Sequence, residues 1–172
     1  MKHIALLLSL LLLLTGCAAE SAPDEALPPA PPPDTISYDG TLFQFNDLTY
    51  DLTERNSSIN AIMDCAVVTP YVIVEGHIGP REGYYGIFNT ITKEFEKDII
   101  GSHLIYRDND IETAVYSFEN SIYNYSGERI GTCNMEEFDL IYELAFAENN
   151  TRVRVEIIPN GTDVSTEQFF DL

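Results

Sequence analysis

Two histidines, two cysteines and a short acidic run are the side chains beyond residue 20 that could carry out chemistry. His77 and His103 lie far apart, and no Gly-x-Ser-x-Gly nucleophile elbow accompanies them. Nucleophilic catalysis needs a base beside the nucleophile, so the sequence assigns no catalytic residue. We expect both histidines to be exposed or hydrogen-bonded. The sequence also has no phosphate-binding glycine loop and no dinucleotide fingerprint, so we expect no cofactor.

The acidic run and the cysteines each leave two interpretations open. Asp108, Asp110 and Glu112 place oxygen ligands at alternating positions, which suits calcium, but the run lacks the glycine and the distant glutamate of an EF-hand loop. A β-turn with side-chain to backbone hydrogen bonds explains the run equally well. In an oxidising compartment Cys65 and Cys133 could form a disulfide, and two buried free thiols are the alternative. Two cysteines and two distant histidines do not make a zinc pattern.

Aromatic side chains are the remaining candidates for binding. The chain has ten Tyr, nine Phe and no Trp. Tyr84 and Tyr85 follow a glycine-rich turn, and Tyr123 and Tyr125 alternate along one expected strand. Such residues could stack on a sugar or pack against a partner. The alternative is packing across neighbouring strands, which tyrosine favours.

These candidates must be positioned by a chain that begins with an export signal. Lys2 precedes an apolar run over residues 4–14, interrupted by Ser9. This is typical of a secretory signal peptide and is too short for a transmembrane helix, which needs about 20 apolar residues. The segment Leu14-Thr15-Gly16-Cys17 resembles the lipobox of bacterial lipoproteins. The resemblance implies cleavage before Cys17, lipid on its sulfur, and anchoring to the extracytoplasmic face of the cell membrane.

A proline-rich tether is expected to follow Cys17. Six of the nine prolines fall in residues 18–37, where no aromatic residue occurs. Such a segment cannot form a core and favours extended polyproline II, which rises roughly 3.1 Å per residue. We therefore expect a signal peptide over residues 1–16, a lipidated tether over 17–37 and a single β domain over 38–172.

The charge of the chain excludes several partners. The sequence has 28 acidic and nine basic side chains, a formal net charge of −19. Nucleic-acid binding needs a basic surface, so we exclude it. Charge-driven docking on anionic lipid is disfavoured for the same reason, which leaves Cys17 as the contact with the bilayer. An acidic surface is explained by solubility. The more specific interpretation is that it binds a cationic ligand. With 28 acids, a pair of carboxylates for glycan hydrolysis cannot be chosen from the sequence.

Residues 38–172 consist of short apolar or alternating segments between turn signals, which is typical of β-strands. Near the end, Ser165 and Gln168 resemble a capping box and predict a short C-terminal helix. The expected strands are 42–45, 48–52, 62–68, 71–78, 84–89, 92–99, 104–107, 113–118, 121–125, 138–146 and 152–158.

An internal sequence repeat suggests how these strands are grouped. The segments that begin Phe45-Asn46, Phe88-Asn89 and Phe118-Glu119 each join a strand ending in an aromatic residue to a polar turn and a second strand. They are similar to the hairpins of β-propeller blades, and residues 144–153 look like the hairpin of TolB-type repeats. Blades need about 40 residues and rings at least four blades, so the chain is too short to close.

The sequence therefore predicts an all-β fold, an antiparallel meander of blade-like hairpins resembling an incomplete propeller, around one core. A two-layer β-sandwich is the alternative. An open sheet edge could be protected by a second copy of the chain. We expect a membrane-anchored, non-enzymatic module that binds an unknown protein or glycan. The alternative is a small surface glycan hydrolase that uses paired carboxylates.

Overall fold

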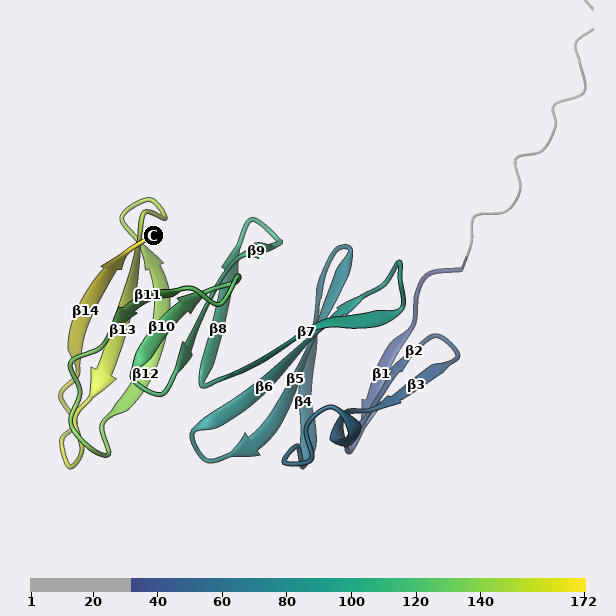
Figure 1. Cartoon of the computed structure of the whole chain (residues 1–172), viewed down its shortest axis with the longest axis horizontal. Helices are drawn as coiled ribbons and strands as arrows, with labels where there is room; N and C mark the ends of the chain where they lie inside the picture. The colour runs from purple at the N-terminus through teal and green to yellow at the C-terminus, as the bar shows by residue number, and fades with distance from the viewer. Residues whose placement is uncertain (1–31) are drawn as a thin grey trace, which may run out of the picture. The chain divides into compact units, whose positions relative to one another are not determined.

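In a computed structural model, which describes residues 32–172, the chain folds into four antiparallel sheets that follow one another in sequence (Figure 1). The predicted signal peptide, Cys17 and most of the tether lie outside these residues. Sheet A contains β1 (Ile36–Asp39), β2 (Leu42–Phe45) and β3 (Leu48–Asp51), followed by the 3₁₀ turn η1 (Leu52–Glu54). Sheet B contains β4 (Ala61–Val68), β5 (Tyr71–Gly79), β6 (Glu82–Asn89) and β7 (Glu94–Gly101). Sheet C contains β8 (His103–Arg107), β9 (Asp110–Phe118), β10 (Ser121–Asn124) and β11 (Arg129–Thr132). Sheet D contains β12 (Leu140–Ala147), β13 (Arg152–Ile158) and β14 (Thr166–Asp171).

Each sheet is a meander in which every strand pairs with the next one along the chain. Several hairpin turns carry residues with positive φ, among them Asn46, Lys93 and Glu119, a backbone conformation that tight hairpin turns require. These turns belong to the three repeated segments that begin at Phe45, Phe88 and Phe118. The Phe45 and Phe88 copies form the last hairpins of sheets A and B, whereas the Phe118 copy forms the middle hairpin of sheet C. The third copy is therefore shifted by one strand, which explains its short offset.

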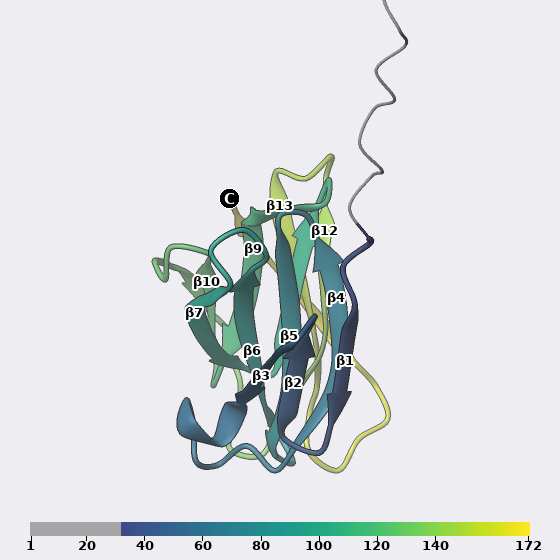
Figure 2. The same ribbon diagram turned by 90° about the vertical axis from the view of Figure 1, so that its right-hand side faces the viewer.

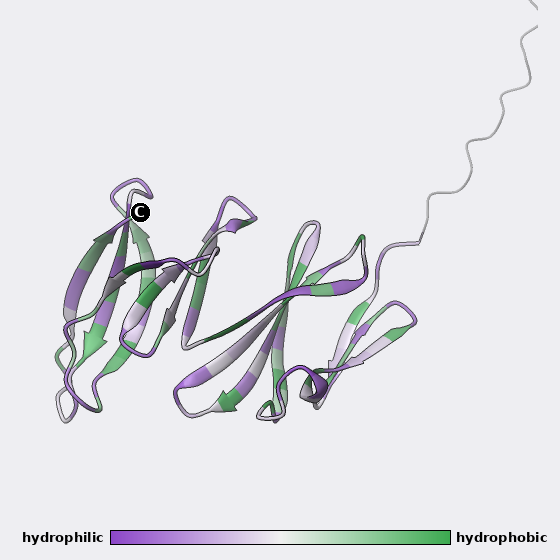
Figure 3. Cartoon of the chain, in the orientation of Figure 1, coloured by the Kyte–Doolittle hydropathy of each residue, from purple (hydrophilic) through white to green (hydrophobic). Residues whose placement is uncertain are grey.

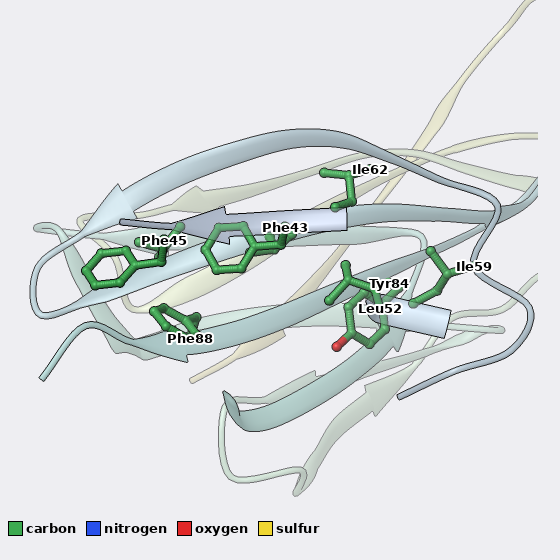
Figure 4. Packing of buried hydrophobic residues seen from close by; sticks show 9 residues of the cluster. Phe43, Phe45, Leu52, Ile59, Ile62, Tyr84 and Phe88 are labelled. Atoms are coloured by element: carbon green, nitrogen blue, oxygen red, sulfur yellow. The ribbon is translucent and has the colours of Figure 1, made fainter. Parts of the chain in front are cut away.

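The core consists of three apolar clusters, one at each junction between consecutive sheets. Phe43 and Phe45 of sheet A pack against Val72, Tyr84 and Phe88 of sheet B (Figure 4). The second cluster joins sheets B and C, and the third joins sheets C and D. The expectation of one core was thus wrong, because each pair of neighbouring sheets buries its own apolar layer. Four layers also exclude the two-layer sandwich. The described sheets do not close into a ring (Figure 1).

The end sheets carry polar side chains on their outer faces. In sheet D, the buried residues Val153, Val155 and Ile157 alternate along β13 with Arg152 and Arg154, which are less buried. Hydrophobic and hydrophilic segments alternate along the strands of this sheet (Figure 3). The guanidinium of Arg154 forms ion pairs with Glu143, Glu156 and Glu167 of neighbouring positions. On the outer face of sheet A, the Ser37 hydroxyl donates a hydrogen bond to Gln44.

The predicted C-terminal helix is wrong, because residues 166–171 form β14 and pair with β13 along its length. The Gln168 side chain, expected to cap a helix, instead hydrogen-bonds the backbone of Asn134 in both directions. Phe170 packs against the cluster between sheets C and D. Tertiary pairing therefore overrides a local capping signal.

Two short strands, β1 and β11, were not expected from the sequence. Within residues 32–172 no helix has the length and apolar character needed to cross a membrane.

Seen from the sheet A end, β1 and β4 lie side by side (Figure 2). Their contact is specific: the Ile62 amide donates to the Gly40 carbonyl, and the Tyr38 hydroxyl donates to the Met63 carbonyl. The edge of sheet B is thus partly covered by sheet A. The first strands of sheets C and D, β8 and β12, contact each other in the same way.

Candidate functional site

A cleft of about 780 Å³ opens between the end of the β5–β6 hairpin and the segment over residues 135–142 that leads into sheet D. Glu75, Arg81 and Tyr85 line the sheet B wall, and Leu140 and Tyr142 line the opposite wall. Two segments form its floor. Ser102 and His103 lie where β7 passes into β8, and Glu119 and Asn120 form the β9–β10 turn. Its size falls in the range of about 300–1,000 Å³ that is usual for small-molecule sites.

The segment before β12 has no regular structure but is held by hydrogen bonds. The Asp139 carboxylate accepts hydrogen bonds from the backbone amides of Glu136 and Asn160. These two bonds lower the pKa of Asp139 below its usual value, with the amide of Asn160 contributing most. The Arg81 guanidinium donates to the Phe138 carbonyl across the cleft, at 3.4 Å. The wall is therefore shaped before any ligand arrives.

His103 joins sheets C and D at the floor of the cleft. Its Nε2 lies 3.1 Å from the Tyr142 carbonyl oxygen, which can only accept, so Nε2 carries a hydrogen. Burial lowers the pKa of His103, which favours the neutral ring. Nδ1 then accepts from the hydroxyl of Ser102 (3.2 Å) or Ser117 (3.4 Å).

This arrangement suits a structural link better than a nucleophile. Ser117 is fully buried, and Ser102 and Ser117 are also hydrogen-bonded to each other at 2.9 Å. The group that orients the imidazole is a backbone carbonyl, whereas serine hydrolases use a carboxylate there to stabilise the imidazolium. The ring therefore fixes β12 against β8. The second histidine, His77, is exposed and its Nδ1 lies 2.9 Å from the Asn60 side-chain oxygen.

Three polar side chains form a row across sheet B. The strand register pairs Asp64 with Glu75, and Glu75 with Tyr85. Burial raises the pKa of Glu75, and the neighbouring carboxylate of Asp64 raises it further. Burial likewise raises the pKa of Tyr85, whose hydroxyl donates to the Ser102 carbonyl at 3.4 Å.

A second, smaller cleft of about 580 Å³ lies between sheets A and B, beside an ion pair. Arg55 donates two hydrogen bonds to the Asp98 carboxylate, at 2.8 and 2.7 Å, and lies over the Phe95 ring. The buried Tyr84 hydroxyl donates to the same carboxylate. Burial alone would raise the pKa of Asp98, but the hydrogen bonds from Arg55 and Tyr84 outweigh it, and the pKa is lowered. Arg55, Asp98 and Tyr84 thus satisfy one another's hydrogen bonds and link sheets A and B.

The tyrosines proposed for binding are placed differently from one another. Tyr84 is fully buried between sheets A and B, and Tyr85 is 7% exposed and reaches the cleft. Tyr123 stacks on Tyr116, with ring centroids 5.3 Å apart. Tyr125 lies beyond β10, where the Lys97 ammonium sits over its ring at 4.2 Å. Packing thus accounts for Tyr84, Tyr123 and Tyr125, and only Tyr85 contributes to the cleft.

The acidic run forms a turn, and the two cysteines lie apart from each other. Asp108 has positive φ and begins a turn, and the Asp110 carboxylate accepts the Glu112 amide. Within the described chain no three His, Cys, Asp or Glu side chains come together as a metal site. Cys65 and Cys133 are free thiols in different clusters, so the disulfide is not formed. Burial raises the pKa of Cys65 to about 12 and that of Cys133 to about 11, so neither is a reactive thiolate.

No protein-family model, curated protein or solved structure matches this chain.

The cleft could not be found from the sequence, because its walls come from segments separated by tens of residues. Glu75 and Tyr142 were not singled out, and the segment over 135–142 was expected to be strand from residue 138. The one local signal was the glycine-rich turn over residues 79–83, next to His77 and Tyr85.

Proposed function

We propose that the chain is a lipid-anchored envelope protein and that its β region is a non-enzymatic binding module. The observation that carries the proposal is the cleft of about 780 Å³ between sheets B and D, to which both walls contribute polar and apolar side chains. A preshaped concavity lined by both kinds of side chain supports ligand binding. The lipobox-like segment before Cys17 supports the anchor.

The side chains around the cleft favour binding over catalysis. The His103 ring is used in a link between sheets, and neither Cys65 nor Cys133 lines the cleft. Exposed apolar side chains, by contrast, gather at the rim: Met63 is 58% exposed and Tyr142 is 62% exposed. Aromatic residues and methionine are enriched where proteins bind partners. A binding role therefore accounts for these residues, which stability alone does not explain.

Photocrosslinking from the rim tests this function. Tyr142 is replaced by p-benzoylphenylalanine in the full chain, expressed in its bacterial host, and the same residue is placed at Asp163 in an exposed loop as a control. We expect one identified adduct that forms from position 142 and not from 163. Adducts that are the same from both positions, or none from position 142, would contradict a binding role for the cleft.

A glycan hydrolase is the second candidate, favoured by one observation. Glu75 has a raised pKa and its cross-strand neighbour is a second carboxylate, Asp64. Directly opposed residues have Cβ atoms roughly 4.5–5.5 Å apart, compatible with the short carboxylate separation of retaining glycosidases. Turnover of glycan substrates that disappears in both Glu75→Gln and Asp64→Asn would establish it. Absence of turnover across a panel of envelope glycans would exclude it.

A further inference from the structure

The cleft carries carboxylates that the rest of the chain leaves without a partner. Five of them have neither an ion pair nor a side-chain hydrogen bond within residues 32–172. They are Glu75, Glu82, Glu119, Glu136 and Glu137. Elsewhere, Arg55, Arg152 and Arg154 neutralise acids directly. Among the described residues that line the cleft, Arg81 is the only Lys or Arg, and its guanidinium is directed to the Phe138 carbonyl.

The same cleft exposes apolar side chains to water. Met63, Leu140 and Tyr142 line it and are 58%, 41% and 62% exposed. Met63 comes from sheet B and the other two from β12, so the apolar surface spans the opening. Covering such side chains is favourable by roughly 25 cal/mol per Å² of apolar area. An occupant with both cationic and apolar groups would satisfy both features of the wall.

We propose that the cleft binds a short basic peptide segment in which lysine or arginine side chains are flanked by apolar ones. This inference rests on the proposed binding function and names its ligand. A bare metal ion does not fit, since the described residues do not bring three ligands together. An anionic ligand would meet unpaired carboxylates on every side. A polyamine would match the charge but would leave much of the 780 Å³ and the apolar rim uncovered.

Peptide binding to the full chain, purified in a neutral detergent, tests the inference. The probe is a fluorescein-labelled pentapeptide of sequence Lys-Leu-Lys-Tyr-Lys, compared with Glu-Leu-Glu-Tyr-Glu and followed by fluorescence anisotropy. We expect the basic peptide alone to bind, and more weakly as salt rises, because exposed charges are screened. Replacing Glu136 and Glu137 by glutamine should weaken binding about five- to tenfold.

Two controls separate the cleft from the overall negative charge. Asp47→Asn with Asp163→Asn removes the same charge from exposed turns outside the cleft lining and should leave binding within about twofold of the parent. Tyr142→Ala leaves the charge unchanged and should weaken binding about fivefold or more, because it removes an apolar anchor. A non-specific electrostatic attraction would give the opposite pattern and would overturn the inference.

Other outcomes also decide the question. Equal or tighter binding of the acidic peptide, or spermine binding as tightly as the peptide, would overturn the basic-peptide assignment. Specific crosslinks from position 142 would in that case still support a binding cleft. If position 142 gives no specific crosslink, the proposed function itself fails.

Discussion

Replacing Tyr84 by phenylalanine should destabilise the fold by about 1–2 kcal/mol, because it removes one hydrogen bond from a buried link between sheets A and B. The Tyr84 side chain is fully buried, and its hydroxyl lies 2.5 Å from Oδ1 of Asp98. The ring stays in place in the phenylalanine variant, so packing changes little. The change in the free energy of unfolding therefore measures the contribution of the Tyr84 hydroxyl.

The magnitude follows from the charge and exposure of the acceptor. Hydrogen bonds to charged groups contribute about 1.5–3 kcal/mol. The Asp98 side chain is 40% exposed and keeps both hydrogen bonds from Arg55, so water and the guanidinium compensate part of the loss. For a folded region of this size, the expected loss corresponds to a decrease in Tm of roughly 3–8 °C.

The effect should also depend on pH with a definite sign. The pKa of Asp98 is lowered in the folded state, so its ionised form stabilises the fold above the unfolded pKa of about 3.9. That stabilisation is lost as the pH falls through the lowered, folded-state pKa. Tyr84→Phe removes one cause of the lowered pKa, so the difference between parent and variant should be larger at pH 7 than at pH 3.

Urea unfolding followed by far-UV circular dichroism measures both effects. Tyr142→Phe is the matched control, since the Tyr142 ring is 62% exposed, and it should lie within about 0.5 kcal/mol of the parent. The double variant with Asp98→Asn should show coupling of about 1 kcal/mol between positions 84 and 98. A Tyr84→Phe variant as stable as the control, or zero coupling, would refute the link.

Three further predictions concern the anchor, the packing of sheet C and the titration of the cleft. Cys17→Ala should move the protein from the membrane to the soluble fraction, as immunoblotting of fractions would show; unchanged membrane retention would contradict lipidation. Gly101→Ala should destabilise by about 2 kcal/mol or more in urea unfolding, because a Cβ there overlaps the Ser117 carbonyl oxygen, whereas Gly79→Ala meets no atom within 4 Å and should cost under about 1 kcal/mol. Glu75→Gln should stabilise the fold at pH 7 and not at pH 4, because the raised pKa of Glu75 makes its ionised form unfavourable as the pH rises; equal effects at both pH values would contradict it.

Strands were predictable where one local rule decided them. In β13, Arg152 to Ile158 alternate strictly, and the strand has the predicted bounds. β11 contains Gly131 and only four residues, so no periodicity could reveal it. The C-terminal segment shows the limit of local rules, since the capping signature at Ser165 and Gln168 was outweighed by pairing with β13.

Burial was harder to predict than strand position, for a reason visible in β6. Sheets B and C have a neighbouring sheet on both faces, so alternation cannot mark a solvent side. Residues 84–89 are all buried, and the adjacent Tyr84 and Tyr85 point into different clusters. The adjacent pair Tyr84 and Tyr85 does not reveal from the sequence that both faces of sheet B are covered by other sheets. The cleft depends on this stacking order, which only the assembled sheets determine.

An open stack of sheets would expose two apolar faces unless its ends were built differently from its middle. Sheet D ends the stack with Arg152 and Arg154, which pair with acids on the same outer face. The edge of β4, a candidate for pairing with a second copy, already receives the Gly40 carbonyl on its Ile62 amide. The edge of β4 therefore does not need a second copy of the chain to cover it. Met63 and Tyr142, which are 58% and 62% exposed, both line the cleft, and this is why a partner is expected there.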